Sequence, residues 1–128
     1  MIAIDTSAVV TVLLGEPAAE SLVAKLDTSE AHVISLVSVL EAVMVLSRTT
    51  SQPQTVIDGY LLETKIEPYA FDATQAQWAR HAFLTYGKGR HPARLNFGDC
   101  ISYALAKSLA VPLLYVGEEF GKTDLVAA

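Results

Sequence analysis

The sequence has a single cysteine, few charged residues and no long uninterrupted apolar run. One cysteine excludes a disulfide-stapled scaffold and a zinc site built from several thiolates. Charged residues make up 18% of the chain and apolar residues 52%, a balance that excludes intrinsic disorder. No repeat with a period of ~20–50 residues is present, which argues against solenoids and propellers. The length of 128 residues predicts a single domain over residues 1–128.

The sequence also shows no pattern typical of a secretion signal or a membrane span. The N-terminus has no basic leader, and Asp5 lies where a signal peptide needs apolar residues. The most apolar stretch, residues 31–46, contains one histidine, two serines and Glu41, which makes it too polar for a span of ~20 apolar residues. We therefore expect a soluble, cytoplasmic protein without a membrane partner. The net charge of −5 argues weakly against a passive nucleic-acid binder but is compatible with carboxylates that hold metal ions.

Short apolar runs alternate with helical patterns along the chain. Strands are expected at residues 2–4, 33–34, 66–69 and 112–116, with a possible edge strand at 125–127. Helices are expected at residues 8–14, 17–26, 38–46, 54–64, 72–86 and 98–110, followed by a turn and short helix at 117–123. This alternation predicts a three-layer α/β/α fold with a central, mostly parallel sheet of four to five strands. Ligands of such sheets bind outside the carboxyl ends of the strands.

Acidic residues follow several of these predicted strands. Asp5 follows the first strand, Glu41 is expected in the first turn of the next long helix, and Asp99 opens the helix after a long loop. Glu118 and Glu119 follow the last strand. Because the carboxyl ends of parallel strands meet at one edge of a sheet, these acids predict a shared site. Their mutual repulsion would be relieved by a hard divalent cation.

Each acid also has a plain structural explanation. Asp5 can cap the following helix, and Ser38 with Glu41 fits a capping box. Asn96 with Asp99 also fits a helix cap that places an acid in the first turn. The concentration of acids at strand ends nevertheless favours a metal site. Since no histidine accompanies them, Mg²⁺ or Mn²⁺ is favoured over zinc, and the matching chemistry is attack of water on a phosphodiester.

The acids lie in four recognisable segments. These are IAIDTSA at 2–8, VLEA at 39–42, NFGDCISYALAK at 96–107, and LLYVGEEF at 113–120 followed by TDL at 123–125. Together they resemble the PIN domain family, and more narrowly the VapC-type toxins of bacterial toxin–antitoxin pairs, over the whole chain. The resemblance implies a Mg²⁺- or Mn²⁺-dependent endoribonuclease that cuts tRNA or rRNA. It also implies a homodimer and silencing by a VapB-type antitoxin.

The resemblance also assigns roles to the acids. Asp5 and Asp99 would bind the first metal, and Glu41 would bind metal or orient the attacking water. Glu118 or Glu119 would complete a second, weaker site in the presence of RNA. The subgroup usually has aspartate directly before the phenylalanine, where this chain has Glu119. That departure leaves the choice between the two glutamates open, and it leaves a catalytically weak PIN-fold module, acting mainly through its antitoxin, as the alternative function.

Two further groups are candidate substrate contacts. Thr6 or Ser7 would hydrogen-bond a metal ligand or the scissile phosphate, or would simply cap the helix. Lys88 and Arg90 lie in a basic loop that also contains His91 and Arg94, and no acid lies between residues 72 and 99. This loop is interpreted either as a phosphate contact beside the acids or as a solvated connection.

Overall fold

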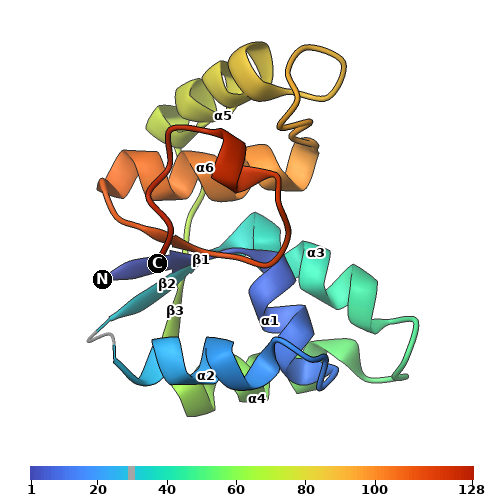
Figure 1. The fold of residues 1–128 in the computed structure, drawn as a ribbon. Helices are drawn as coiled ribbons and strands as arrows, with labels where there is room; N and C mark the ends of the chain where they lie inside the picture. Colours follow the sequence, from blue (N-terminus) through green and yellow to red (C-terminus); the bar gives the residue numbers. More distant parts are fainter. Residues whose placement is uncertain (29–30) are drawn as a thin grey trace.

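Four short parallel strands form the centre of the fold. The structure is a computed structural model that describes residues 1–28 and 31–128. The strands are β1 (Ile2–Ile4), β2 (His32–Ser35), β3 (Ile66–Tyr69) and β4 (Leu113–Leu114), in the order β3-β2-β1-β4 (Figure 1). Consecutive residues of β1 and β2 are buried on both faces, which is typical of parallel sheets covered by helices on each side. The predicted parallel α/β sheet is therefore confirmed, with four strands.

Six α-helices cover the two faces of this sheet. They are α1 (Thr6–Leu13), α2 (Ala19–Asp27), α3 (Leu36–Leu46), α4 (Pro53–Thr64), α5 (Ala73–Tyr86) and α6 (Phe97–Leu109), and a short 3₁₀ helix spans Phe120–Lys122. Helices α1 to α4 pack on one face, in a core that includes Ile4 and Leu46. Helices α5 and α6 pack on the other, in a core that includes Tyr103 and Leu105 (Figure 1). The outcome is the three-layer α/β/α arrangement.

The end of the chain departs from the prediction. β4 has two residues instead of the five predicted, and residues 125–127 add only a single bridge between Leu113 and Ala127. A 3₁₀ turn at Phe120–Lys122, whose phenylalanine is buried against the core, separates these segments. The last residues are therefore a return segment laid along β4 and not a fifth strand.

The helix after β2 begins earlier than predicted. Its N-cap is Ser35, whose Oγ accepts a hydrogen bond from the Val37 N–H at 3.2 Å. The predicted capping box of Ser38 and Glu41 is therefore wrong, and Glu41 lies in the second turn of α3, not the first. The reason is local, since the hydroxyl of Ser35, the last strand residue, already satisfies one of the free amides at the start of the helix.

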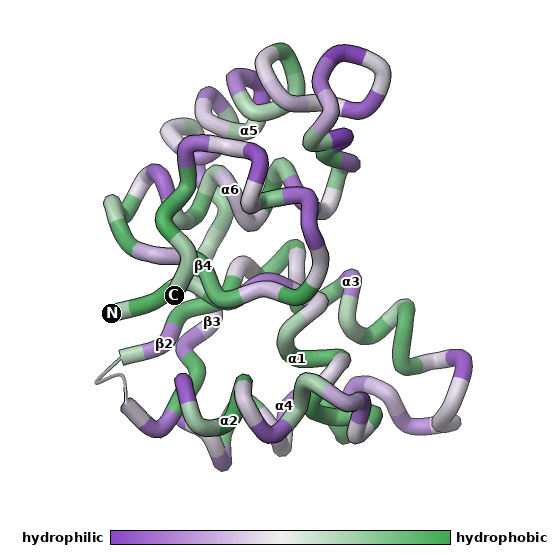
Figure 2. The backbone as a smooth tube through the Cα atoms, in the orientation of Figure 1, coloured by the Kyte–Doolittle hydropathy of each residue, from purple (hydrophilic) through white to green (hydrophobic). Residues whose placement is uncertain are grey.

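Two large apolar side chains of the helices are exposed. Leu40 of α3 is 58% exposed and Phe83 of α5 is 45% exposed. The buried positions of α5 are Gln75 and Ala82, because α5 packs against α6 along that stripe. Figure 2 shows the loop between α5 and α6 as mostly hydrophilic and the strands β1 and β4 as hydrophobic. Within the residues described, no helix combines the length and the apolar character needed to cross a membrane.

Candidate metal centre and active site

Asp5 lies at the carboxyl end of β1 and is almost fully buried, with 4% of its surface exposed. Its Oδ2 accepts hydrogen bonds from the Ser7 N–H at 3.0 Å and the Ser7 hydroxyl at 2.6 Å. Its Oδ1 accepts a hydrogen bond from the Ser102 hydroxyl at 2.5 Å. The predicted helix cap is thus confirmed. Both carboxylate oxygens are held in one orientation by donors from the protein.

Asp99 lies in the first turn of α6, in the capping box predicted from the sequence. Its Oδ2 accepts from the Asn96 N–H at 3.0 Å, and the Asn96 Oδ1 accepts from the Asp99 N–H at 2.9 Å. Burial, together with the negative charges of Asp5, Glu119 and Glu41, raises the pKa of Asp99 to about 6 against the lowering effect of the Asn96 hydrogen bond. The charges of three other carboxylates, from three different segments of the chain, therefore act on Asp99.

Two glycines allow the glutamates to approach. The Glu41 carboxylate lies against the backbone of Gly98, and a methyl group at that position would come within 2.8 Å of Glu41 Oε1. The Glu119 carboxylate folds back over Gly117, whose φ of 113° favours glycine. Glu118 is exposed, as Glu119 is, but it is not among the carboxylates that raise the pKa of Asp99. Of the two adjacent glutamates, the geometry therefore brings Glu119 into the electrostatic field of Asp99.

The charge of these acids is unbalanced. The one ion pair in the described part of the chain joins Lys107 to Asp124, away from the acids. Oxygen donors without histidine suit a hard cation such as Mg²⁺ or Mn²⁺, so the donor set fits the predicted metal. Across residues 1–28 and 31–128, however, no three acidic, histidine or cysteine side chains come together as a ready-made metal-binding cluster. A cation would have to draw the carboxylates closer than they are here.

The predicted substrate contacts divide into two groups. The Thr6 hydroxyl donates to the Ser38 carbonyl oxygen at 3.1 Å, so it ties α1 to α3. The Ser7 hydroxyl donates to Asp5 and accepts from the Val116 N–H at 3.0 Å, which links Asp5 to the loop carrying the two glutamates. Each hydroxyl gives its only proton to another protein atom, so Ser7 positions Asp5 and Thr6 joins two helices. A phosphate contact by either one stays a prediction.

The basic loop also splits in the structure. A cavity of about 390 Å³ is lined by Lys88, Ala93, Arg94, Asn96, Glu118, Glu119 and Lys122. Lys88 therefore lines the same cavity as the two glutamates, whereas the Arg90 guanidinium stacks on the Phe83 ring at 5.2 Å from its centroid. Arg94 belongs to the basic loop that the sequence indicates as a candidate phosphate contact, and it lines this cavity too. Lys122 was not assigned from the sequence, where its only signal is nearness to Glu119, which does not report side-chain direction.

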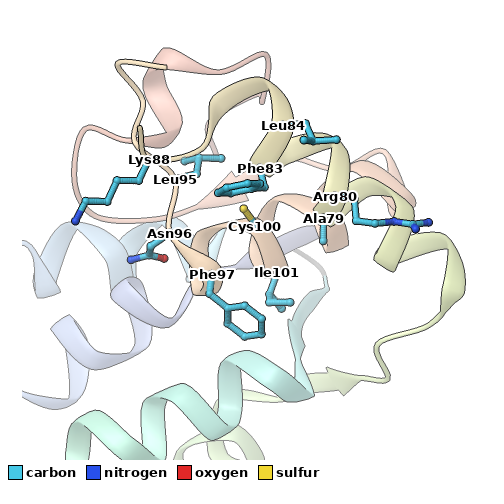
Figure 3. A pocket seen from close by; sticks show the side chains of 10 residues that line it. All are labelled: Ala79, Arg80, Phe83, Leu84, Lys88, Leu95, Asn96, Phe97, Cys100 and Ile101. Carbon is cyan, nitrogen blue, oxygen red and sulfur yellow. The ribbon is translucent and has the colours of Figure 1, made fainter. Parts of the chain in front are cut away.

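An apolar cavity lies on the other side of the first turn of α6. It measures about 560 Å³, and its lining includes Phe83, Phe97 and Cys100 (Figure 3). Lys88 and Asn96 line both this cavity and the polar one. Burial, with the Asp99 charge, raises the pKa of Cys100 to about 11. Cys100 is therefore a neutral thiol at pH 7 and not a nucleophile.

Comparison with known proteins places this arrangement in a family. The PIN domain model matches residues 2–125. Ribonuclease VapC30 of Mycobacterium tuberculosis is 43% identical over 123 residues, which cover 95% of this chain and 94% of the relative. Ribonuclease VapC of Mycolicibacterium smegmatis is 44% identical over 125 residues, covering 97% of each. The chain belongs to the PIN domain family and, within it, to the VapC-type ribonucleases of toxin–antitoxin systems.

Solved structures agree on the fold at low sequence identity. The chain is similar to Mycobacterium tuberculosis VapC20, described as a sarcin–ricin loop cleaving toxin, with a TM-score of 0.80 and 15% identity over 100% of this chain and 98% of that one. It is also similar to a toxin–antitoxin complex from Klebsiella pneumoniae, with a TM-score of 0.75 and 18% identity over 100% and 97% of the two chains. These likenesses confirm the predicted fold class.

Proposed function

We propose that residues 1–128 form one PIN domain that hydrolyses RNA phosphodiester bonds at the carboxylates around Asp99, with Mg²⁺ or Mn²⁺ as the cofactor. The observation that carries this is the unneutralised charge there: burial and three neighbouring carboxylates raise the pKa of Asp99 to about 6. Repulsion between these carboxylates destabilises the protein, and a bound cation would relieve it. Such repulsion is therefore expected at a site that binds a cation.

Asp5 and Asp99 would hold the cation. When bound, it would lower the pKa of a water molecule and shield charge on the phosphate. Asp5 is preset for this role by three hydrogen bonds, and Asp99 is held by its capping box. Glu41, seated against Gly98, would bind metal or orient the attacking water, and Glu119 would complete the acidic site in the presence of RNA. Glu118 is the weaker candidate because it is not among the carboxylates that raise the pKa of Asp99.

The substrate we propose is structured RNA, tRNA or rRNA, with its backbone in the cavity next to the glutamates. Lys88, Arg94 and Lys122 line that cavity and supply the positive charge that an acidic protein needs beside its site. Arg90 stacks on Phe83, so we propose that it stabilises the loop and does not contact RNA directly. The sarcin–ricin loop is the target named for VapC20, and it is one of the rRNA targets to test.

Two protein partners are proposed. The first is a VapB-type antitoxin. The second is another copy of this chain, which would cover the apolar surface on both sides of Phe97. That side chain is 78% exposed between the 560 Å³ cavity and a smaller one of about 240 Å³ lined by Leu40 and Met44. An apolar surface of this kind is rarely left in water.

The test is RNA cleavage by the purified protein, freed from its antitoxin, with and without a divalent cation. Cleavage of total tRNA and rRNA in Mg²⁺ or Mn²⁺, its loss in EDTA, and its loss in Asp5→Asn are the expected results. Cleavage that persists in EDTA would contradict the metal-dependent mechanism. Cleavage by Asp5→Asn at the wild-type rate would contradict the role of Asp5.

A further inference from the structure

Beneath the acids, two buried serine hydroxyl groups lie behind the Asp5 carboxylate. Ser38 is 2% exposed and Ser102 is 1% exposed. Their Oγ atoms are 3.4 Å apart, although the residues are 64 positions apart in the sequence. The Ser102 hydroxyl donates to Asp5 Oδ1 at 2.5 Å, a contact between residues 97 positions apart.

We propose that Ser102, supported by Ser38, is a positioning residue that fixes the orientation of the Asp5 carboxylate and thereby sets the affinity of the site for its divalent cation. This inference rests on the proposed function. Neither serine is a catalytic residue in this view, since both act through Asp5.

The direction of each hydrogen bond follows from counting protons. A serine hydroxyl has one proton to donate and two lone pairs that accept. Among the described residues, the one carboxylate that accepts from Ser102 is Asp5, so the Ser102 proton goes to Asp5 Oδ1. The Ser38 hydroxyl is then the donor to Ser102. The hydrogen bonds therefore run in one direction, with Ser38 donating to Ser102 and Ser102 donating to Asp5.

The placement of these serines repeats on two helices. Ser38 lies three residues before Glu41 on α3, and Ser102 lies three residues after Asp99 on α6. Residues three apart share one face of a helix. Each hydroxyl is therefore one turn from an acid on the same helix, and the Ser38–Ser102 contact sets how the two helices, and hence their acids, sit relative to Asp5.

A purely structural role for Ser102 predicts a different pattern. Buried serines in helices commonly donate to a carbonyl oxygen one turn earlier. Ser108, on the same helix, does this with the Leu105 carbonyl oxygen at 3.0 Å. Ser102 instead donates to a charged side chain of another element in a site closed to water, where such a bond is strong and directional. Ser7 holds only Oδ2, so nothing else among the described residues holds Oδ1.

The experiment compares Ser102→Ala with Ser108→Ala, which removes the same atom from the same helix away from the site. Mn²⁺ binding is measured by calorimetry without RNA, and cleavage is measured over a range of Mn²⁺ concentrations. We expect Ser102→Ala to bind Mn²⁺ about 10-fold more weakly, since loss of a residue that orients a metal ligand typically costs ~10–100-fold. Its kcat falls at fixed Mn²⁺, recovers in part at high Mn²⁺, and its KM for RNA stays unchanged. Ser108→Ala matches the wild type.

Equal Mn²⁺ affinity and equal kcat in the two variants would overturn the inference. Should Ser102→Ala fail to fold, Ser38→Ala is the deciding variant, because it leaves the Ser102–Asp5 bond and removes only the support behind it. A rise of roughly 2- to 3-fold in the Mn²⁺ dissociation constant is then expected, and no rise would reject the role.

Failure of the proposed function gives a distinct result. A wild-type protein that neither binds Mn²⁺ nor cleaves RNA would reject the metal-dependent nuclease itself. The positioning claim is then decided by a crystal structure of metal-free Ser102→Ala. A rotated Asp5 carboxylate supports it, and an unchanged Asp5 rejects it.

Discussion

Asp99 lies at the N-terminal end of α6 and Asp124 packs against its C-terminal half, and the two carboxylates have opposite surroundings. Asp124 accepts hydrogen bonds from the Tyr103 hydroxyl at 2.9 Å and from Lys107 at 2.6 Å. Burial opposes its ionisation, but these two donors outweigh burial and lower its pKa. Asp99 has no cationic partner, and burial with three other carboxylates raises its pKa to about 6.

The comparison separates a structural acid from a functional one. The Asp124 carboxylate neutralises Lys107 and holds the C-terminal segment onto α6, so its charge serves the fold. The negative charge of Asp99 lowers the stability of the fold unless a cation is bound. Strain of this electrostatic kind marks functional sites in general, because natural sequences depart from local consistency mainly where function requires it.

The largest expected effect is on cleavage. Asp99→Asn is expected to lower the rate of RNA cleavage by roughly 100-fold or more, because a bound cation supplies several kcal/mol of transition-state stabilisation and this variant removes a ligand charge. Asp124→Asn, the matched change at the other aspartate, is expected to cleave within about 2-fold of the wild type at 25 °C. The measurement is the initial rate of RNA cleavage by each variant and by the wild type at equal Mg²⁺. Similar losses in both variants would mean that the two acids do not differ in function.

The second effect concerns the two adjacent glutamates. Glu119→Gln is expected to reduce kcat about 10-fold, because its carboxylate contributes to the field at Asp99. Glu118→Gln is expected to stay within about 3-fold, because Glu118 is not among the carboxylates that raise the pKa of Asp99. Single-turnover cleavage of one RNA compares them directly. A larger loss in Glu118→Gln would reverse the assignment.

The third effect extends the comparison to the cations. Replacing Lys88 and Arg94 together with alanine is expected to weaken RNA binding and to flatten its salt dependence by about one to two phosphate contacts. Arg90→Ala is the control within the same loop, since its guanidinium stacks on Phe83 and does not line the polar cavity. Plots of log binding constant against log salt give the slopes. The same slope for the double variant and the wild type would move the RNA contact elsewhere on the protein.

The smallest effect is on stability, and its sign differs between the aspartates. Without metal at pH 7, Asp99→Asn is expected to raise the free energy of unfolding by about 1 kcal/mol, after allowing for solvent screening of a partly exposed group. Asp124→Asn is expected to lower it by about 0.5–1 kcal/mol, because a partly exposed ion pair is lost. Urea titrations of both variants give these values. A loss of stability in Asp99→Asn would show that its capping bonds outweigh the repulsion.

The pH dependence follows from the same shifts. The raised pKa of Asp99 means that the native state holds this proton more tightly than the unfolded chain does. Its contribution to stability is therefore complete below about pH 4 and is lost as the pH rises through about 6. Asp99→Asn is expected to flatten this part of the curve, and added Mg²⁺ is expected to stabilise the wild type at pH 7 but not the variant.

Local signals in the sequence predicted much of the fold. The strand at residues 66–69 was predicted with the bounds that the structure has. The helix predicted over residues 72–86 ends at Tyr86 as predicted and begins one residue later, at Ala73. The Asn96–Asp99 cap was also predicted, because it depends on residues three positions apart. The cap of α3 was misplaced for the opposite reason, since two serines three residues apart, Ser35 and Ser38, both fit that role and only the end of the strand chooses between them.

The acids themselves could be named from their places after the strands, but their partners could not. Ser102 gives no sequence signal of its own, because its bond to Asp5 spans 97 residues. The split between Lys88 and Arg90 was equally hidden, since both are cations in one loop and only the packing of Phe83 turns one of them away.

Short stretches of sequence determine the order of strands and helices, most helix caps and the identity of the acids. They can do so because backbone hydrogen bonding and helix capping act over a few residues. Which hydroxyl orients Asp5, which glutamate acts on Asp99 and which cations line the cavity were decided by tertiary structure alone. Those properties depend on distances of a few ångströms between segments that meet only after α3, α6 and the loop after β4 have packed around the end of β1.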